Sequence, residues 1–258
     1  MHIKGKNVLV TGASSGIGAA TAIEMARLGA RLVIAARRRE ALDEVAAACR
    51  RFGVVCIPIA ADVTRRADCA RLIAEAGTVD VLVNVAGFAI FDSVEDAHPD
   101  DLQSMMQTNY FGAVWCTQAV LPQMLARHSG VIVNVGSIAG AMGFARMGGY
   151  CATKFALAGF TEALRDEVIG RGVEVSLVAP ATTKTDFFVT AEHGKMPKAS
   201  RLILAMPPER VARAICRAAE GGTDRRIVPL TAALFIRFKE FFPRLAHMLM
   251  RRVSALLE

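Results

Sequence analysis

Three side chains of this sequence could transfer a proton or hold a negatively charged oxygen. Tyr150 and Lys154 are four residues apart, which places them on one face of a helix, and Ser137 lies thirteen residues before Tyr150. An ammonium beside a phenol favours the phenolate, so we expect the pKa of Tyr150 to fall below its usual value of about 10. Such a tyrosine could act as an acid or base while the Ser137 hydroxyl binds a substrate oxygen. In isolation, a tyrosine and a lysine at this spacing are usually an ordinary surface pair.

A glycine turn near the amino terminus could hold a diphosphate. Gly12, Gly16 and Gly18 follow the apolar run Val8-Leu9-Val10 and precede an alanine-rich helical segment. Gly12 lets the backbone leave the strand in a conformation closed to a β-carbon, Gly16 permits close approach to a diphosphate, and Gly18 permits close helix packing. The helix amino terminus supplies N–H groups for an anion. This order of strand, turn and helix predicts a dinucleotide site, although a turn that serves only packing would share it.

The elements that must position these residues alternate between apolar runs and helical segments. After the first strand and helix, we expect strands at 31–36, 54–59, 79–84, 131–135, 173–178 and 226–228, with helices at 39–51, 68–76, 102–125, 149–169 and 209–220. Apolar strands separated by helices predict an α/β fold with a doubly wound parallel sheet of the Rossmann type. Ligands should gather at the carboxyl ends of its strands. We expect one domain over 1–229 and a helical tail over 230–258.

Further motifs along the chain resemble those of the short-chain dehydrogenase/reductase family over about residues 6–229. The family's glycine motif matches at Thr11, Gly12, Gly16 and Gly18, and its aspartate after the third strand matches Asp62-Val63. Its Asn-Asn-Ala-Gly segment matches Asn84-Val85-Ala86-Gly87, with valine in place of the second asparagine. Its helix asparagine, serine, tyrosine and lysine match Asn109, Ser137, Tyr150 and Lys154. Its Pro-Gly segment appears as Pro180-Ala181, followed by Thr185.

The resemblance implies hydride transfer between nicotinamide C4 and a carbonyl or alcohol carbon. Tyr150 would donate the proton in reduction, Lys154 would bind the nicotinamide ribose, and Ser137 would hold the substrate oxygen. Asn109 would anchor a water that links Lys154 to solvent. The implied cofactor-binding residues are Gly12, Ser14, Ser15, Gly16, Ile17, Gly18, Arg37, Arg38, Asp62, Val63, Asn84, Ala86, Gly87, Tyr150, Lys154, Pro180, Thr183 and Thr185.

The second strand predicts that NADP(H) is preferred over NAD(H). Ala36 stands where cofactors without a 2′-phosphate usually meet an acidic residue, and Arg37, Arg38 and Arg39 follow it. Arg37 is the expected phosphate ligand, because guanidinium binds phosphate with paired hydrogen bonds. A solvated helix start is the alternative. A sensor that binds NADPH without catalysis would keep the glycine motif, but it would not need Ser137, Tyr150 and Lys154.

Composition narrows the possible partners and the cellular location. The net charge of +7 could attract nucleic acid, an anionic membrane or an anionic cofactor, but no recognised nucleic-acid-binding motif accompanies the arginines. The six cysteines show no metal-ligand spacing, so we expect no metal and free thiols in a reducing cytoplasm. The first strand begins too early to leave room for a signal peptide. These features predict a cytoplasmic protein.

Apolar side chains near the motifs favour a hydrophobic substrate, although core packing explains some of them equally well. They are Phe88, Ile90, Phe91, Ile138, Met142, Phe144, Met147, Phe187 and Phe188. The long segment 182–208 suits a lid over the site. Small residues at helical spacing, Ala152, Ala156, Gly159 and Ala163, suggest that another helix approaches the one carrying Tyr150, as in the family's homo-dimers and homo-tetramers. Packing of this stripe on the chain's own sheet is the alternative.

The segment 230–258 reads as a basic amphipathic helix that Pro243 should break or kink. Its apolar side holds Leu234, Phe238, Phe241, Phe242, Leu245, Met248, Leu249 and Leu256, and its polar side holds Arg237, Glu240, Arg244, His247 and Arg251. Its longest uncharged run is too short to span a bilayer, which takes about twenty residues. The apolar side could lie on a membrane surface, or it could cover a neighbouring subunit or the protein's own substrate cleft.

Overall fold

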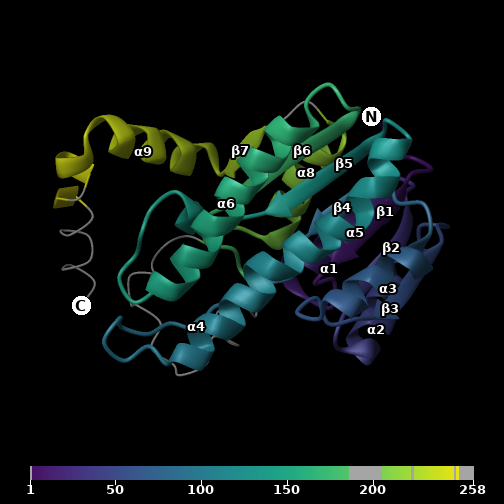
Figure 1. Ribbon diagram of the computed structural model, residues 1–258, viewed down its shortest axis with the longest axis horizontal. Coiled ribbons are helices and arrows are strands. Elements are labelled where there is room, and N and C mark those ends of the chain that lie inside the picture. Colours follow the sequence, from purple (N-terminus) through teal and green to yellow (C-terminus); the bar gives the residue numbers. More distant parts are fainter. Residues whose placement is uncertain (1, 186–204, 222–223, 247, 250–258) are drawn as a thin grey trace.

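A seven-stranded parallel sheet forms the centre of the computed structural model, which describes residues 2–185, 205–221, 224–246 and 248–249 (Figure 1). Its order is β3-β2-β1-β4-β5-β6-β7. The strands are β1 (Asn7–Thr11), β2 (Arg31–Ala36), β3 (Cys56–Ala60), β4 (Val81–Asn84), β5 (Gly130–Val135), β6 (Val173–Pro180) and β7 (Arg225–Val228). The strand order reverses between β1 and β4, which is where open α/β sheets bind ligands. The predicted doubly wound α/β fold is confirmed.

Helices cover both faces of the sheet, because alternate strand residues point to opposite sides. Val8 and Val10 pack with α1 (Gly16–Arg27), α2 (Arg39–Arg50) and α8 (Pro208–Ala219). Leu9 faces the other layer, made by α3 (Arg66–Ala76), α5 (Gly112–Ala126) and α6 (Gly148–Val168). Both layers are mainly apolar, so the packed sheet supports the residues at its carboxyl edge.

The long helix predicted over 102–125 is longer and less regular than expected. It begins with α4 (Pro99–Met106), passes through a π-helical turn η1 (Gln107–Phe111) and continues as α5. His98 precedes Pro99, and its imidazole accepts a hydrogen bond from the Asp100 amide at 3.3 Å. A proline at the first helical position loses no hydrogen bond, which explains the earlier start. The strands predicted at 54–59 and 79–84 begin two residues later, at Cys56 and Val81.

The predicted lid lies mostly outside the described residues, which exclude 186–204 and with them Phe187 and Phe188. Its two described ends are joined to each other. The Lys184 amide donates to the Met206 carbonyl at 2.8 Å, and the Met206 amide donates to the Thr182 carbonyl at 3.0 Å. The segment therefore leaves and returns to the body at one place beside β6.

The carboxy-terminal helix α9 (Leu230–Phe241) lies outside the main body, next to the β7 edge of the sheet (Figure 1). The helix ends before Phe242 and resumes at Pro243, so the predicted break is confirmed. The predicted division into one apolar and one polar side is wrong for α9, because Ile236 is buried while Leu234 and Phe241 face outward beside Arg237. Residues 247 and 250–258, with Arg251 and Leu256, lie outside the described residues. No helix among the residues described is both long and apolar enough to cross a membrane.

Candidate active site

The glycine turn links the carboxyl end of β1 to α1. Gly12 and Gly16 have φ angles of +65° and +55°, which side chains with a β-carbon rarely adopt. A β-carbon on Gly18 would lie 2.2 Å from the Gly12 carbonyl oxygen, so only glycine lets α1 pack on the turn. The Ser15 side chain makes no capping hydrogen bond, and no acidic residue lies in the first turn of α1. This helix end therefore keeps the positive polarity that attracts a diphosphate.

Thr11 ties the glycine turn to the end of β4. Its hydroxyl oxygen accepts hydrogen bonds from the amides of Val85 and Ala86 at 3.2 and 3.4 Å. The sequence match marked Thr11 as part of the glycine motif without a physical role. The structure supplies one, since this hydroxyl sets the spacing between two walls of the site.

Three consecutive arginines follow β2, and their side chains have different surroundings. Arg38 donates a hydrogen bond to the Ser14 hydroxyl at 3.3 Å, which brings its guanidinium over the glycine turn. Arg39 points along α2 and pairs with Asp43 at 3.0 Å. Arg37 and Arg38 line the cavity described below, together with Ala36. Two guanidinium groups and no carboxylate thus stand at the end of β2.

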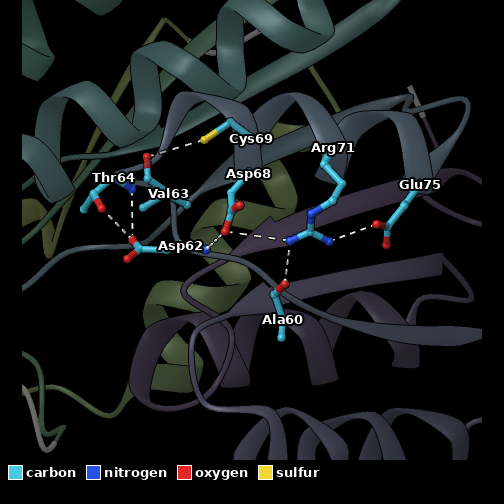
Figure 2. Close-up of polar contacts among 8 residues, drawn as sticks. All are labelled: Ala60, Asp62, Val63, Thr64, Asp68, Cys69, Arg71 and Glu75. Atoms are coloured by element: carbon cyan, nitrogen blue, oxygen red, sulfur yellow. Dashed lines mark hydrogen bonds and ion pairs between the residues drawn. The ribbon is translucent and has the colours of Figure 1, made fainter.

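Asp62 stands at the carboxyl end of β3, held by the network in Figure 2. Its Oδ1 accepts hydrogen bonds from the Thr64 amide at 3.0 Å and the Thr64 hydroxyl at 2.8 Å. Its own amide donates to Asp68 at 3.0 Å, and Arg71 pairs with Asp68 and donates to the Ala60 carbonyl. Its Oδ2 accepts no hydrogen bond from the described part of the chain. A fixed carboxylate with one open oxygen can accept a hydrogen bond from a ligand.

Ser137, Tyr150 and Lys154 meet at the carboxyl end of β5. Ser137 caps the short helix η2 (Ile138–Gly140), accepting from the Ala139 amide at 3.1 Å, and its hydroxyl also hydrogen-bonds the Tyr150 phenol. Lys154 and Tyr150 lie on one face of α6. The Lys154 ammonium donates to the Val135 carbonyl at 3.1 Å and lies 5.8 Å from the centre of the Tyr150 ring.

Burial dominates the proton affinities of this group. It raises the pKa of Tyr150 well above its ordinary value, and the Ser137 hydrogen bond opposes only part of that rise. It lowers the pKa of Lys154 to about 8. The expected fall in the pKa of Tyr150 is therefore wrong for the protein alone. The ammonium stands over the ring and is held by a backbone carbonyl rather than by the phenol oxygen.

Asn109 lies in the π-helical turn η1 and is 1% exposed. Its Oδ1 accepts from the Phe88 amide at 2.9 Å, and its Nδ2 donates to the Phe88 carbonyl at 2.8 Å and the Thr153 hydroxyl at 3.0 Å. A β-carbon on Gly87 would lie 3.0 Å from Oδ1 of Asn109. Asn109 thus joins the loop after β4 to α6, one residue before Lys154. The π turn that aims it could not be read from the sequence.

One cavity of about 980 Å³ runs along the carboxyl edge of the sheet and connects these groups. Its size lies at the upper end of the range for small-molecule sites, roughly 300–1,000 Å³. The predicted site residues that line it are Gly12, Ser14, Ser15, Gly16, Ile17, Gly18, Arg37, Arg38, Asp62, Val63, Ala86, Gly87, Ser137, Tyr150, Lys154, Pro180, Thr183 and Thr185. Asn84 and Asn109 do not line it. No group of metal-binding side chains occurs among the residues described.

Comparison with known proteins accounts for this arrangement. The pattern of the short chain dehydrogenases matches residues 6–195. An NADP-dependent 3-hydroxy acid dehydrogenase from Schizosaccharomyces pombe is 38% identical over 224 residues, covering 83% of this chain and 86% of the relative. This chain belongs to the short-chain dehydrogenase/reductase family. Its sequence motifs and its fold agree with that membership.

Other members of the short-chain dehydrogenase family are similar over most of their length. The ketoacyl reductase HetN from Nostoc is 33% identical, with 90% of this chain and 82% of the relative covered. Rat 17-beta-hydroxysteroid dehydrogenase 13 is 31% identical, with 93% and 80% covered. A short-chain dehydrogenase from Sphingobium yanoikuyae in complex with NADPH superposes with a TM-score of 0.82, at 29% identity and with 95% of each chain covered.

A nicotinamide dinucleotide fits the residues of this short-chain dehydrogenase. The uncapped start of α1 suits the diphosphate of the cofactor. The open oxygen of Asp62 can accept a hydrogen bond from the adenine base, and Lys154 lies at the opposite end of the cavity. Val85 and Ala181, which depart from the family motifs, leave the cofactor cavity intact, and both line it. The Ala181 amide donates a hydrogen bond to the Val228 carbonyl at 2.7 Å.

Asn84, predicted to bind cofactor, lies inside the protein instead. Its Nδ2 donates to Oδ1 of Asn134 at 2.9 Å and to the Thr117 hydroxyl at 3.3 Å, and Asn134 donates to the Thr161 hydroxyl at 3.0 Å. This chain of polar side chains joins β4 and β5 to α5 and α6. Asn84 is the last residue of β4, so its side chain points into a helical layer while Val85 and Ala86 reach the cavity.

The substrate end of the cavity combines apolar and polar walls. Of the predicted apolar residues, Phe88, Ile90, Ile138, Phe144 and Met147 line it, whereas Phe91 and Met142 are buried in the core. Asp101, Ser104 and Thr108, missed in the sequence, also line it. Their spacing of three and four residues puts them on one helical face, a signal that could have been read.

Proposed function

We propose that this enzyme uses NADPH to reduce the carbonyl group of a hydrophobic substrate, or oxidises the corresponding alcohol with NADP⁺. One observation carries the proposal. A single cavity has Ser137, Tyr150 and Lys154 at one end and Arg37 and Arg38, with no acidic residue at position 36, at the other. The first group suits reaction at an oxygen, and the second suits a phosphate.

The protein's own residues would supply and stabilise the proton. When bound, the cofactor supplies the hydride that reduces the carbonyl carbon. The carbonyl oxygen becomes negative as this happens, so hydroxyl donors placed at that oxygen stabilise the transition state more than the ground state. Ser137 and Tyr150 offer those donors side by side. Because burial raises the pKa of Tyr150, the phenol holds its proton at Oη at neutral pH and can transfer it.

The arginines support a preference for NADPH. Arg37 and Arg38 both line the cavity, whereas Arg39 is paired with Asp43. Arg38 is already positioned by Ser14, so it shares the role first assigned to Arg37 alone. A relative whose name states NADP dependence and a neighbour solved with NADPH agree, although another neighbour is solved with NAD. The preference therefore needs its own test.

The apolar wall supports a hydrophobic substrate. Phe88, Ile90, Phe144 and Met147 surround the space beside Tyr150, while Asp101 and Ser104 add polar groups to it. The names of three relatives, a 3-hydroxy acid dehydrogenase, a ketoacyl reductase and a hydroxysteroid dehydrogenase, each refer to a hydroxyl or keto group. We infer a mainly apolar ketone or aldehyde with a polar substituent away from the reacting carbon.

The deciding experiment is NADPH consumption over ketones and aldehydes of rising chain length and ring size. We expect turnover that Tyr150→Phe abolishes, with NADPH affinity changed by no more than a few-fold, because only the transferable proton is lost. Tyr110→Phe is the matched control, since Tyr110 is the other tyrosine of the chain and contacts Phe111 and Phe160. NADPH binding without turnover of any carbonyl would favour the sensor, and an active Tyr150→Phe enzyme would refute the mechanism.

Cofactor choice is tested by removing the arginines one at a time. We expect Arg37→Ala and Arg38→Ala each to reduce the NADPH-over-NADH ratio of kcat/KM by about 1–3 kcal/mol in free energy, the range for charge-assisted hydrogen bonds. Arg39→Ala should leave the ratio unchanged, because Arg39 pairs with Asp43 and does not line the cavity. Equal kcat/KM values for the two cofactors in the native enzyme would contradict the preference.

We also propose a homo-oligomer formed through α6. Ala152, Gly159 and Ala163 are exposed, and a β-carbon on Gly159 would meet nothing within 4 Å. The stripe of small residues therefore faces away from the chain's own sheet, contrary to the packing alternative. Phe155 is exposed on the same helix. A monomeric mass by light scattering at micromolar concentration would decide against this assembly.

A further inference from the structure

Exposed apolar side chains are concentrated in the carboxy-terminal segment. Fourteen large apolar side chains are exposed in the described part of the chain, and seven of them fall between residues 230 and 249. They are Leu230, Leu234, Phe241, Phe242, Leu245, Met248 and Leu249. The other seven are spread from Phe52 to Ile169. Large apolar groups gathered on one surface of a soluble protein usually mark an interaction site.

The exposed groups of α9 form one face of the helix. Ile236 points toward the protein and is 3% exposed. Leu230, Leu234 and Phe241, at spacings of four and seven residues, are 71%, 60% and 76% exposed. Beyond the break, Phe242, Leu245, Met248 and Leu249 are exposed as well. The segment is thus attached by one side and uncovered on the other.

Basic residues accompany this face. Arg237 is exposed between Leu234 and Phe241 along the helix, and Arg244 is exposed in the following turn. The described part of the segment, 230–246 and 248–249, contains three basic residues, Arg237, Lys239 and Arg244, and one acidic residue, the exposed Glu240. Leucine and phenylalanine beside arginine are the composition of helices that lie at the surface of anionic bilayers.

The segment is attached next to the substrate end of the cavity. The Lys239 ammonium donates to the Ala141 carbonyl at 3.4 Å. Ala141 directly follows η2, whose Ile138 and Ala139 line the cavity beside Ser137. A surface that bound the outer face of α9 would therefore lie near the substrate end of the site.

We propose that residues 230–246 and 248–249 bind the surface of a bilayer that contains anionic phospholipid. A second copy of this chain fits the face less well. A symmetric contact sets the same patch against itself, so four exposed arginines, Arg237 and Arg244 of each copy, would share the interface with only two exposed carboxylates, Glu240 of each copy. Lipid phosphates would neutralise the same charges while the acyl region buries Leu234 and Phe241. This inference goes beyond the proposed reaction and does not rest on it.

Flotation of the full chain with lipid vesicles tests the proposal. The probes are phosphatidylcholine vesicles with and without phosphatidylglycerol, at physiological salt. We expect the protein to float with the anionic vesicles and to stay at the bottom with the neutral ones. Loss of binding at high salt should follow, because the attraction between surface charges is screened. Flotation needs no substrate, so its result is independent of whether the carbonyl reaction is assigned correctly.

Two double variants remove the apolar and the charged parts of the face separately. Leu234→Ser/Phe241→Ser should lower vesicle partitioning by about tenfold or more, from lost apolar burial. Arg237→Glu/Arg244→Glu should lower partitioning on anionic vesicles by at least about tenfold, because each charge near an anionic surface matters about fivefold. All four side chains are exposed, so these variants should fold.

Matched controls change the same residue types elsewhere. Ile169→Ser alters an apolar side chain that is 77% exposed at the end of α6, and Arg51→Glu alters an exposed arginine at the end of α2. Both should float like the native chain. The proposal is overturned if the native chain does not float with anionic vesicles, or if the tail variants float as well as the controls. It is equally overturned if the tail variants change only the mass measured by light scattering, which would assign the face to a second copy.

Discussion

Replacing Lys154 by methionine should abolish the activity of this protein while leaving its stability at neutral pH nearly unchanged. Lys154 is 4% exposed, and burial lowers its pKa from 10.5 to about 8. A charged ammonium is therefore less favourable in the folded protein than in the unfolded chain, by about 3 kcal/mol at one pKa unit per 1.36 kcal/mol. This free-energy cost applies in full at neutral pH, which is below the pKa of Lys154 in the folded protein. The cost decreases as the pH rises from that pKa toward the pKa of Lys154 in the unfolded chain.

The sign of the pH dependence follows from proton counting. Between about pH 8 and pH 10.5 the unfolded chain holds more protons on Lys154 than the folded protein does, so stability rises with pH there. The native protein should gain about 2 kcal/mol from this group between about pH 7 and pH 9.5. Lys154→Met lacks the titrating group and should not show that gain. At neutral pH the variant should differ little from the native protein, because the loss of the hydrogen bond to Val135 costs about 1–3 kcal/mol and offsets the relief.

Urea unfolding at several pH values measures this difference, and other titrating groups cancel because both proteins contain them. The exposed Lys4 provides the control, since Lys4→Met should follow the native profile. Carbonyl reduction by Lys154→Met should be lost while the protein remains folded. If the native protein and Lys154→Met show parallel stability profiles over this pH range, the assigned burial cost of Lys154 is refuted.

Three further changes test the frame of the site. Ala36→Asp should shift the preference toward NADH, because a carboxylate repels the 2′-phosphate and can bind the free ribose hydroxyls. The kcat/KM values with NADPH and NADH measure this shift, and an unchanged ratio would contradict it. Gly18→Ala should lower the free energy of unfolding by about 1–3 kcal/mol or more, because its β-carbon would lie 2.2 Å from a backbone oxygen. Asn109→Ala should cost about 1–3 kcal/mol, since it leaves the half-buried amide and carbonyl of Phe88 without their side-chain partner. A loss below about 1 kcal/mol in the urea assay would show that water replaces those bonds.

The fold and the main side chains of the site could be predicted from the sequence because the local sequence patterns agreed with one another. The alternation of apolar strands and helices predicts the sheet, and the glycine turn identifies its first crossover. Helical spacing places Tyr150 and Lys154 on one face, and the resemblance to the motifs of the short-chain dehydrogenase/reductase family assigned them and Ser137 to the site. Each of these features depends on residues close together in the sequence, which is why no knowledge of distant contacts was needed.

Features that depend on distant contacts were not readable. The direction of the Tyr150 pKa shift depends on how deeply several segments bury the phenol, and spacing does not reveal that. Asn84 belongs to a recognisable motif, yet only the packing of α5 and α6 shows that it faces the interior. The division of α9 into an apolar and a polar side was wrong for a different reason. At about 100° per residue, Arg237 lies within about 60° of both Leu234 and Phe241 around the helix, so that error did not depend on distant contacts.

The π-helical turn at Gln107–Phe111 carries one residue more than a regular helix would need over the same length. Because the wide turn absorbs that residue, α4 and α5 keep the orientation that they would have in one regular helix. Deleting one residue there would restore an ordinary hydrogen-bonding pattern without rotating α4, so Asp101 and Ser104 would stay on the cavity wall. The side chains of the turn itself would change direction, and Asn109 would lose its hydrogen bonds to Phe88. The extra residue therefore decides how the loop after β4 is tied to α6, independently of the shape of the substrate wall.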